Sequence, residues 1–223
     1  MTLPAGPGAD LRSEIAAAAA RLIADEGFDY GTARRRAAEL VTGHGRVARH
    51  RMPDDADVES ALREHLRLFA GDEQPRLLAA LRQLALQWME RLAAFNPHLA
   101  GAALNGTATA HSDLALHLFT DSAKDVEMFL INDGVDFDVI EGDRVPGGPD
   151  ETIQFVVPPP REHGLPPRVG IRLAIHAVDA IRVAPRRRST DAQLHRVEQM
   201  GRAGIDAVRE LLADAARGRR DAG

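Results

Sequence analysis

The sequence predicts an α+β or α/β fold: a helical N-terminal region docked on a mixed sheet of about four or five strands, closed by a C-terminal helix. Two changes of pattern support this prediction. Apolar side chains recur every three or four residues as far as residue 96, which is the period of helices, and then alternate with polar ones, which is the period of strands. Residues 190–217 return to a charged, helical pattern.

Four helices are expected within residues 1–96, each opened by a favourable first residue. Ser, Thr and Asp side chains accept hydrogen bonds from the free N–H groups at a helix start, and glycine adopts the left-handed conformation that ends a helix. The expected starts are Ser13, Thr32, Asp54 and Pro75, and the first two helices end at Gly27 and Gly43. The fourth has the clearest apolar stripe and should be a core element; it contains Leu77, Leu81, Leu84, Trp88 and Leu92.

The change of period falls at Asn96–Pro97, and residues 97–182 are expected to form an α/β unit. Its strand candidates are residues 99–105, 114–118, 135–139, 152–157 and 169–178. A helix capped by Ser122 and ended by Gly134 separates the second strand from the third. Alternation in the second strand buries its leucines and leaves a chemically richer face, which carries Asp113, Ala115 and His117.

Several classes of site are excluded by residue types that the chain lacks. Cysteine is absent, which excludes disulfides, thiolate nucleophiles and Cys-ligated metals. The single lysine, Lys124, is not in a glycine-rich loop, so no Walker-type phosphate loop is present. The Gly-x-Ser-x-Gly elbow of the serine hydrolases does not occur either.

The net charge of −5 is distributed unevenly along the chain. Residues 1–96 carry −1, residues 97–182 carry −7 and residues 183–223, a basic helix and tail, carry +3. An acidic middle segment disfavours a nucleic-acid backbone as its unaided partner, because that affinity comes from neutralising phosphates. The triplets Arg34–Arg36 and Arg186–Arg188 remain as candidate phosphate contacts, with a solvated helix face as the alternative.

The N-terminal residues predict a frayed tail and a cytoplasmic protein. MTLPAGPGADLRSE has neither the cationic start nor the apolar core of a signal peptide. The smoothest apolar run, Ile15 to Ala20, is far shorter than the roughly 20 residues that span a bilayer. We therefore expect no membrane partner, and the sequence leaves the oligomeric state open.

The densest polar constellation is LNGTATAHSDLALHLFTDS, residues 104–122. A strand that ends in Gly and a small hydroxyl residue, followed by Ser-Asp at the start of an alternating strand, resembles the nucleotidyltransferase (polymerase-beta-type) superfamily over roughly residues 99–145. In that family the glycine turn leads into a helix whose amides hold nucleotide phosphates. An Asp-x-Asp pair and a third Asp on a neighbouring strand hold two magnesium ions.

The resemblance implies a role for six residues of this chain. Gly106, Thr107 and Ser112 would bind the nucleotide phosphates, and Asp113 would be the first catalytic, magnesium-binding carboxylate. Asp136 or Asp138 would be the third carboxylate. Ala115 stands where the family has its second aspartate, and alanine cannot coordinate a metal. His117, the next residue on that face, suits magnesium poorly.

Three functions stay open on the sequence. The first is a nucleotidyltransferase-like protein that is atypical or non-catalytic and binds a nucleotide or a nucleotide-bearing partner. The second is an active, magnesium-dependent nucleotidyltransferase. The third is a helical DNA-binding regulator, because residues 15–40 resemble the first helix and turn of tetracycline-repressor-type regulators, although residues 43–55 supply no recognition helix.

Each candidate residue also has a structural interpretation. Gly106 can be an ordinary turn glycine, and Ser112 with Asp113 a strand-start pair that bonds the local backbone. Asp136 and Asp138 can lie on the solvated face of a strand. If the N-terminal helices cover the polar face of the sheet, that face is part of the core. If they leave it open, it can be a functional site.

Overall fold

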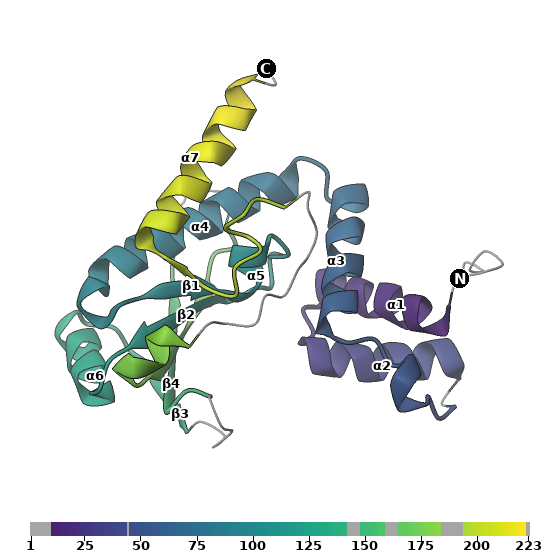
Figure 1. Ribbon diagram of the computed structural model, residues 1–223, viewed down its shortest axis with the longest axis horizontal. Coiled ribbons are helices and arrows are strands. Elements are labelled where there is room, and N and C mark those ends of the chain that lie inside the picture. Colours follow the sequence, from purple (N-terminus) through teal and green to yellow (C-terminus); the bar gives the residue numbers. More distant parts are fainter. Residues whose placement is uncertain (1–9, 44, 142–147, 159–164, 184–193, 222–223) are drawn as a thin grey trace. The chain divides into compact units, whose positions relative to one another are not determined.

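The protein has an α+β fold (Figure 1). The computed structural model describes residues 10–43, 45–141, 148–158, 165–183 and 194–221. The chain divides into two compact units, Met1–Gln74 and Pro75–Gly223. No helix among the described residues combines the length and the hydrophobicity that a bilayer crossing requires.

The N-terminal unit is built from three α-helices and one short 3₁₀ helix. Their bounds are α1 Leu11–Glu26, α2 Tyr30–Thr42, η1 Arg49–Arg51 and α3 Asp55–Phe69. Asp54 and Asp57 cap the start of α3 reciprocally, as the sequence predicts. The expected cap of α2 is shifted, because the side chain of Asp29 accepts the N–H of Thr32 and thereby starts the helix at Tyr30.

Apolar faces of these three helices form a core of their own. Small residues of α1 and α2 allow close helix contact, and larger aliphatic side chains of α1 and α3 fill the remaining space. The most buried members include Ile15, Ala19, Ala33, Ala37, Val58 and Leu62.

The second unit contains the sheet and most of the remaining helices. Its helices are α4 Glu73–Arg91, η2 Ala93–Phe95, α5 Gly101–Asn105, α6 Ala123–Asn132, η3 Val178–Arg182 and α7 Ile205–Asp221. Its strands are β1 His98–Ala100, β2 Leu114–Phe119, β3 Asp138–Glu141, β4 Glu151–Val157, β5 Val169–His176 and β6 Ala203–Gly204. Helix α4 begins just before the unit boundary, and its apolar stripe belongs to the core of the second unit.

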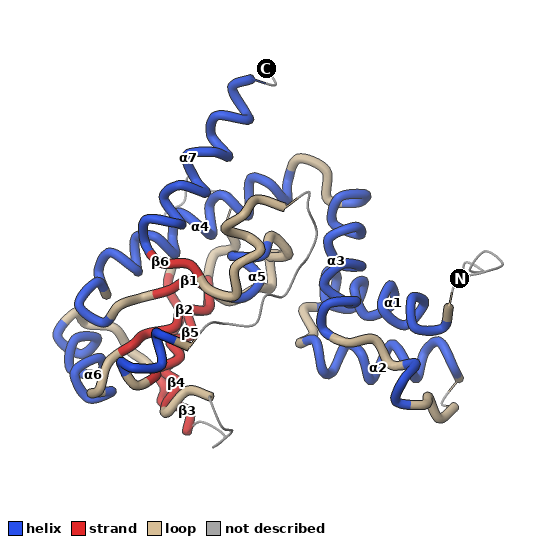
Figure 2. Tube along the Cα trace, viewed as in Figure 1, coloured by secondary structure: helices blue, strands red, loops and turns tan. Residues whose placement is uncertain are grey.

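The six strands form one mixed sheet in the order β3-β4-β5-β2-β1-β6 (Figure 2). Strands β2 and β5 are parallel, and the other neighbouring pairs are antiparallel. It follows that β2, β5 and β3 run in the same direction. Their first residues therefore lie at one end of the sheet, beside the last residues of β4.

One face of the sheet is buried against helices. The leucines of β2 and alternate residues of β4 and β5 join apolar side chains of α4, α6 and α7 in a single core. Trp88 of α4 packs on Phe155 of β4, with ring centroids 4.8 Å apart. The opposite side of each strand carries the polar side chains, so the sheet has one core face and one chemically available face.

Three sequence predictions about this unit are wrong. The strand expected at residues 135–139 begins only at Asp138 and continues to Glu141. Residues 99–105 do not form one strand, because the chain turns at Gly101, whose φ of 67° favours glycine, and continues as α5. A short apolar run cannot distinguish a strand from a buried helix. The C-terminal helix is also shorter than predicted: α7 begins at Ile205, and residues 194–200 form turns.

Candidate functional site

A hollow of about 470 Å³ lies at the end of the sheet where β2, β5 and β3 begin. We call it the carboxylate hollow. It is lined by Asp113, Asp136, Phe137, Asp138, Gln154, Phe155, Val156, Arg168, Gly170 and Ile171. The three metal-binding carboxylates that the sequence predicts thus line one cavity, whose size is in the range of small-molecule sites.

Strand register explains how residues far apart in the sequence reach the hollow. Asp113 directly precedes β2, which pairs with β5 from Leu114 and Ile171 onward. Gly170 of β5 lies opposite Val156 of β4, and Gln154 of β4 lies opposite Asp138 of β3. Asp136 precedes β3 by two residues, so it flanks the strand and is not part of it.

The carboxylate of Asp113 lies against position 170 of β5. A Cβ atom at position 170 would collide with the carboxylate of Asp113. Glycine inside a strand often marks such an approach. The absence of a side chain at position 170 therefore lets the Asp113 carboxylate lie against the backbone of β5.

The three carboxylates occupy two sides of the hollow. Strands β5 and β4 separate β2 from β3, so Asp113 and Asp138 start strands that are about 14 Å apart at the usual strand spacing. Asp136 and Asp138 are on the β3 side, and all three carboxylate residues are exposed. Within the described residues they do not form a group of three ligand atoms close enough to share one ion.

Among the described residues, the strand positions next to Asp113 carry no second carboxylate. Ala115 lies opposite Ala100 of β1 on one side and Arg172 of β5 on the other. The guanidinium of Arg172 is 3.5 Å from Asp113 Oδ2, and both side chains are about half exposed. A cation therefore compensates Asp113, and Ala115 supplies no metal ligand.

The predicted phosphate turn is not part of the hollow. Gly106 ends α5 in the left-handed conformation, with a φ of 84°, and Thr107 follows it. Thr107 is only 1% exposed, and its N–H and hydroxyl both donate to Asn105 Oδ1, at 3.1 and 2.7 Å. The turn follows a helix instead of leading into one, and a helix C-terminus repels anions.

Ser112 completes the same loop. Its hydroxyl accepts the N–H of Thr109 at 2.9 Å, and its own N–H donates to the Thr109 carbonyl. These bonds match the structural interpretation of a pair that bonds the local backbone. The loop connects α5 to β2 and so fixes the position of Asp113 at the start of the strand.

A buried ion pair lies beneath the turn. Arg82 of α4 donates to the carbonyls of Ala103 and Leu104 and to Glu198 Oε1, at 2.8, 3.0 and 2.6 Å. Burial lowers the pKa of Arg82, and Glu198 opposes that effect. A Cβ atom at Gly106 would lie 3.4 Å from Glu198 Oε1, so a phosphate at this turn would meet a carboxylate.

His117, considered above as a metal ligand, pairs with another histidine. Its Nδ1 atom is 3.0 Å from Nε2 of His176 on β5, and His176 also packs on Phe119. The pair lies toward the opposite ends of β2 and β5 from the carboxylate hollow. Burial lowers the pKa of His176, which favours the neutral form of that imidazole.

A second group has the residue types of a metal site. His195, Glu210 and Asp214 place ligand atoms within 4.8 Å of one another. His195 Nδ1 accepts the N–H of Val197, which leaves the proton on Nε2 for the bond to Asp214 at 2.9 Å. Arg196 and Arg217 pair with Glu210 and Asp214 respectively. An ion-paired hydrogen-bond cluster accounts for this geometry without a metal.

Several residues of the hollow were not identified from the sequence. Phe137 lies between the two predicted aspartates, and Arg168 directly precedes β5. The sequence feature that could have indicated this region was Gly170, since a glycine within an apolar strand indicates that another group approaches the backbone closely. Of the predicted arginine triplets, Arg186–Arg188 lie outside the described residues.

Comparison with models of protein families, with curated proteins and with solved structures gives no match. The chemistry of the hollow is therefore the basis for any functional conclusion. It combines oxygen ligands for hard cations, one guanidinium, one amide and one aromatic side chain that is partly accessible.

Proposed function

We propose that this protein binds a nucleotide in the carboxylate hollow through a divalent cation, as an atypical, nucleotidyltransferase-like protein that does not catalyse efficient transfer. The observation that carries the proposal is the convergence of Asp113, Asp136 and Asp138 on one cavity that also holds Arg168.

Charge explains why a cation is part of the proposal. Three carboxylates repel phosphates, and two arginines, Arg168 in the lining and Arg172 paired with Asp113, do not fully compensate them. Mg²⁺ is commonly held by one or two protein carboxylates together with phosphate oxygens and water, so it does not require three protein ligands within reach of one ion. Asp136 with Asp138, or Asp113 alone, would hold the ion, which would supply the positive charge that phosphates need.

The uncharged lining suits the remainder of a nucleotide. Phe137 is partly accessible and offers a ring on which a base can stack, and Gln154 offers both a donor and an acceptor to a base edge. Arg168 would contact a phosphate that the cation leaves uncovered.

Weak or absent transfer activity follows from the residues beside Asp113. In-line phosphoryl displacement by two metals requires carboxylates that hold both ions a short distance apart. Ala115 and Arg172 occupy the neighbouring positions on the same side of the sheet, and neither coordinates a metal. Binding can persist under these conditions, whereas stabilisation of the transition state cannot.

Calorimetric titration of the full chain with ATP, with and without Mg²⁺, tests this function. We expect binding that requires Mg²⁺ and weakens by about tenfold or more, a loss of about 1.4 kcal/mol, in the one of Asp113→Ala and Asp138→Ala that removes a ligand of the ion. Asp179→Ala, an exposed aspartate of η3 outside the hollow, is the matched control. Binding that is equally strong without Mg²⁺ and in both hollow variants would exclude the proposed function.

A further inference from the structure

Charge is segregated within the N-terminal unit. Residues 30–53 contain six arginines and one acidic residue, Glu39. The rest of this unit, residues 10–29 and 54–74, contains four arginines and twelve acidic residues. The described part of the basic stretch comprises α2, η1 and the residues on either side of η1.

Most arginines of this unit outside the basic stretch have acidic partners, whereas inside it five of the six form no ion pair within the described residues. Ion pairs join Arg12 to Asp54 and Asp57, Arg63 to Glu59, and Arg67 to Glu64. Arg34 is bound in the same way to Asp55. Five exposed arginines form no ion pair within the described part of the chain; this arginine surface consists of Arg35, Arg36, Arg46, Arg49 and Arg51.

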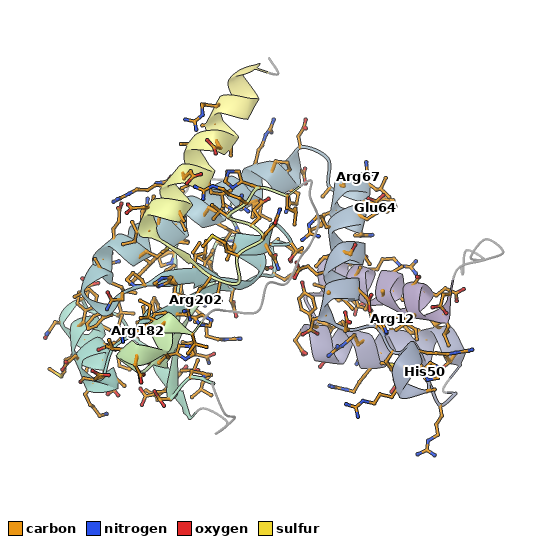
Figure 3. The ribbon with its side chains drawn as sticks, in the orientation of Figure 1. Arg12, His50, Glu64, Arg67, Arg182 and Arg202 are labelled. Carbon is orange, nitrogen blue, oxygen red and sulfur yellow. The ribbon has the colours of Figure 1, made fainter. Side chains whose placement is uncertain are left out.

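The two halves of the arginine surface lie along each other. The N–H of Gly45 donates to the carbonyl of Thr42 at the end of α2, and Arg34 at its start donates to the carbonyl of Pro53. The segment 45–53 therefore returns along α2, whose 13 residues extend about 20 Å. Figure 3 shows His50 of η1 beside Arg12 of α1, and Arg12 donates to the His50 carbonyl, which anchors the segment.

Two of the side chains are held in place before any ligand binds. The guanidinium of Arg36 lies 4.6 Å from the centroid of the Phe28 ring, and Arg35 donates to Thr32 Oγ1 at 3.0 Å. Ordering of this kind lowers the entropy lost when a phosphate binds. Guanidinium groups also match phosphate oxygens with two parallel hydrogen bonds.

We infer that the arginine surface binds the sugar–phosphate backbone of a nucleic acid. Its length of about 20 Å matches roughly six consecutive phosphates of one duplex strand. The acidic remainder of the unit repels the same backbone and confines it to this surface. A lipid surface suits it less well, because Leu40 is the one large apolar side chain among the described residues of 30–53 that is strongly exposed.

Fluorescence anisotropy of the full chain with labelled 20-mers, in EDTA to prevent cation-dependent binding in the hollow, tests the inference. For five phosphate contacts the plot of log K against log salt should have a slope of about −4.5 for duplex DNA and about −3.5 for single-stranded RNA. The exposed triple variant Arg46→Gln, Arg49→Gln, Arg51→Gln should weaken binding at least about tenfold and flatten the slope by about two to three.

The single variants Arg49→Gln and Arg21→Gln form the matched control. Both remove one exposed arginine that has no ion pair within the described residues, but Arg21 lies on α1 outside the arginine surface. Only Arg49→Gln should reduce the slope, by about one. No binding to any 20-mer at 50 mM salt, an unchanged slope in the triple variant, or equal affinity for polyglutamate or anionic vesicles would overturn the inference. None of these outcomes depends on the carboxylate hollow.

Discussion

The glycine–threonine turn at residues 105–109 and the carboxylate hollow, whose first residue is Asp113, differ in how their polar groups are used. At the turn, Thr107 is buried, its donors are bonded to Asn105, and Glu198 lies next to Gly106. In the hollow, Asp113, Asp136 and Asp138 are exposed to a common cavity. Polar groups that are satisfied inside the fold stabilise it, whereas polar groups that face a cavity can bind a ligand.

The largest expected effect concerns the ion pair under the turn. Arg82→Ala leaves Glu198 and two backbone carbonyls without their buried partner and should lower the free energy of unfolding by about 3–5 kcal/mol. Urea denaturation measures this loss. Arg209→Ala, which breaks exposed pairs with Glu90 and Asp206, should cost much less, because water screens exposed ion pairs. Equal losses of unfolding free energy in the two variants would show that the buried ion pair under the turn stabilises the fold no more than an exposed pair does.

The next largest effects are expected from alanine substitutions at one glycine of the turn, Gly106, and one of the hollow, Gly170. Gly106→Ala should destabilise the fold by about 1–2 kcal/mol, because position 106 has a left-handed φ and faces Glu198. Gly170→Ala should instead displace the half-exposed carboxylate of Asp113 and weaken Mg²⁺–ATP binding, while stability changes little, because the displaced atoms belong to a side chain and not to the backbone.

Thermal unfolding and calorimetry of the same two variants measure both quantities. The comparison fails if Gly106→Ala reduces nucleotide affinity without loss of stability, or if Gly170→Ala unfolds the protein and leaves affinity intact.

A smaller effect comes from pH. Burial lowers the pKa of His98 and His176 below the ordinary value of 6.5, so the folded chain binds fewer protons than the unfolded chain as the pH falls through that region. Their contribution is present above pH 6.5 and is lost as the pH falls through the lowered pKa values. The melting temperature should therefore decrease from pH 7.5 to pH 5.5, and less steeply in His176→Gln. A parallel decrease in this variant would contradict the role of His176.

The smallest expected effect is at Arg172. Its exposed pair with Asp113 places a positive charge where a cation would bind, so Arg172→Gln should raise the affinity for Mg²⁺ alone by up to about fivefold. Calorimetry without nucleotide measures the change, and Arg182→Gln of η3 serves as a control remote from Asp113. Weaker Mg²⁺ binding in Arg172→Gln would place the ion away from Asp113.

Part of this arrangement could be predicted from the sequence. Alternation identified β2 and placed Asp113 and His117 on the side of the strand away from the core. The capping pair at Asp54 and the cap at Ser122 were also readable, because they depend on residues three positions apart.

Other parts depend on partners that local patterns do not reveal. Gly106 is a turn glycine whether the turn binds phosphate or is purely structural. Only its proximity to Glu198, 92 residues later, distinguishes the two interpretations. The pairing of β2 with β5 likewise decides that Arg172 compensates Asp113 and that Gly170 admits its carboxylate. Such long-range register is set by tertiary structure.

Hydrogen–deuterium exchange of the full chain with and without Mg²⁺–ATP distinguishes a ligand in the hollow from a ligand at the turn. A ligand in the hollow should give new protection at residues 136–138 and 168–171, in the segments that line it, and no change at residues 104–109, whose polar groups are bonded within the fold. New protection confined to residues 104–109 would contradict binding in the hollow and would place the ligand at the turn.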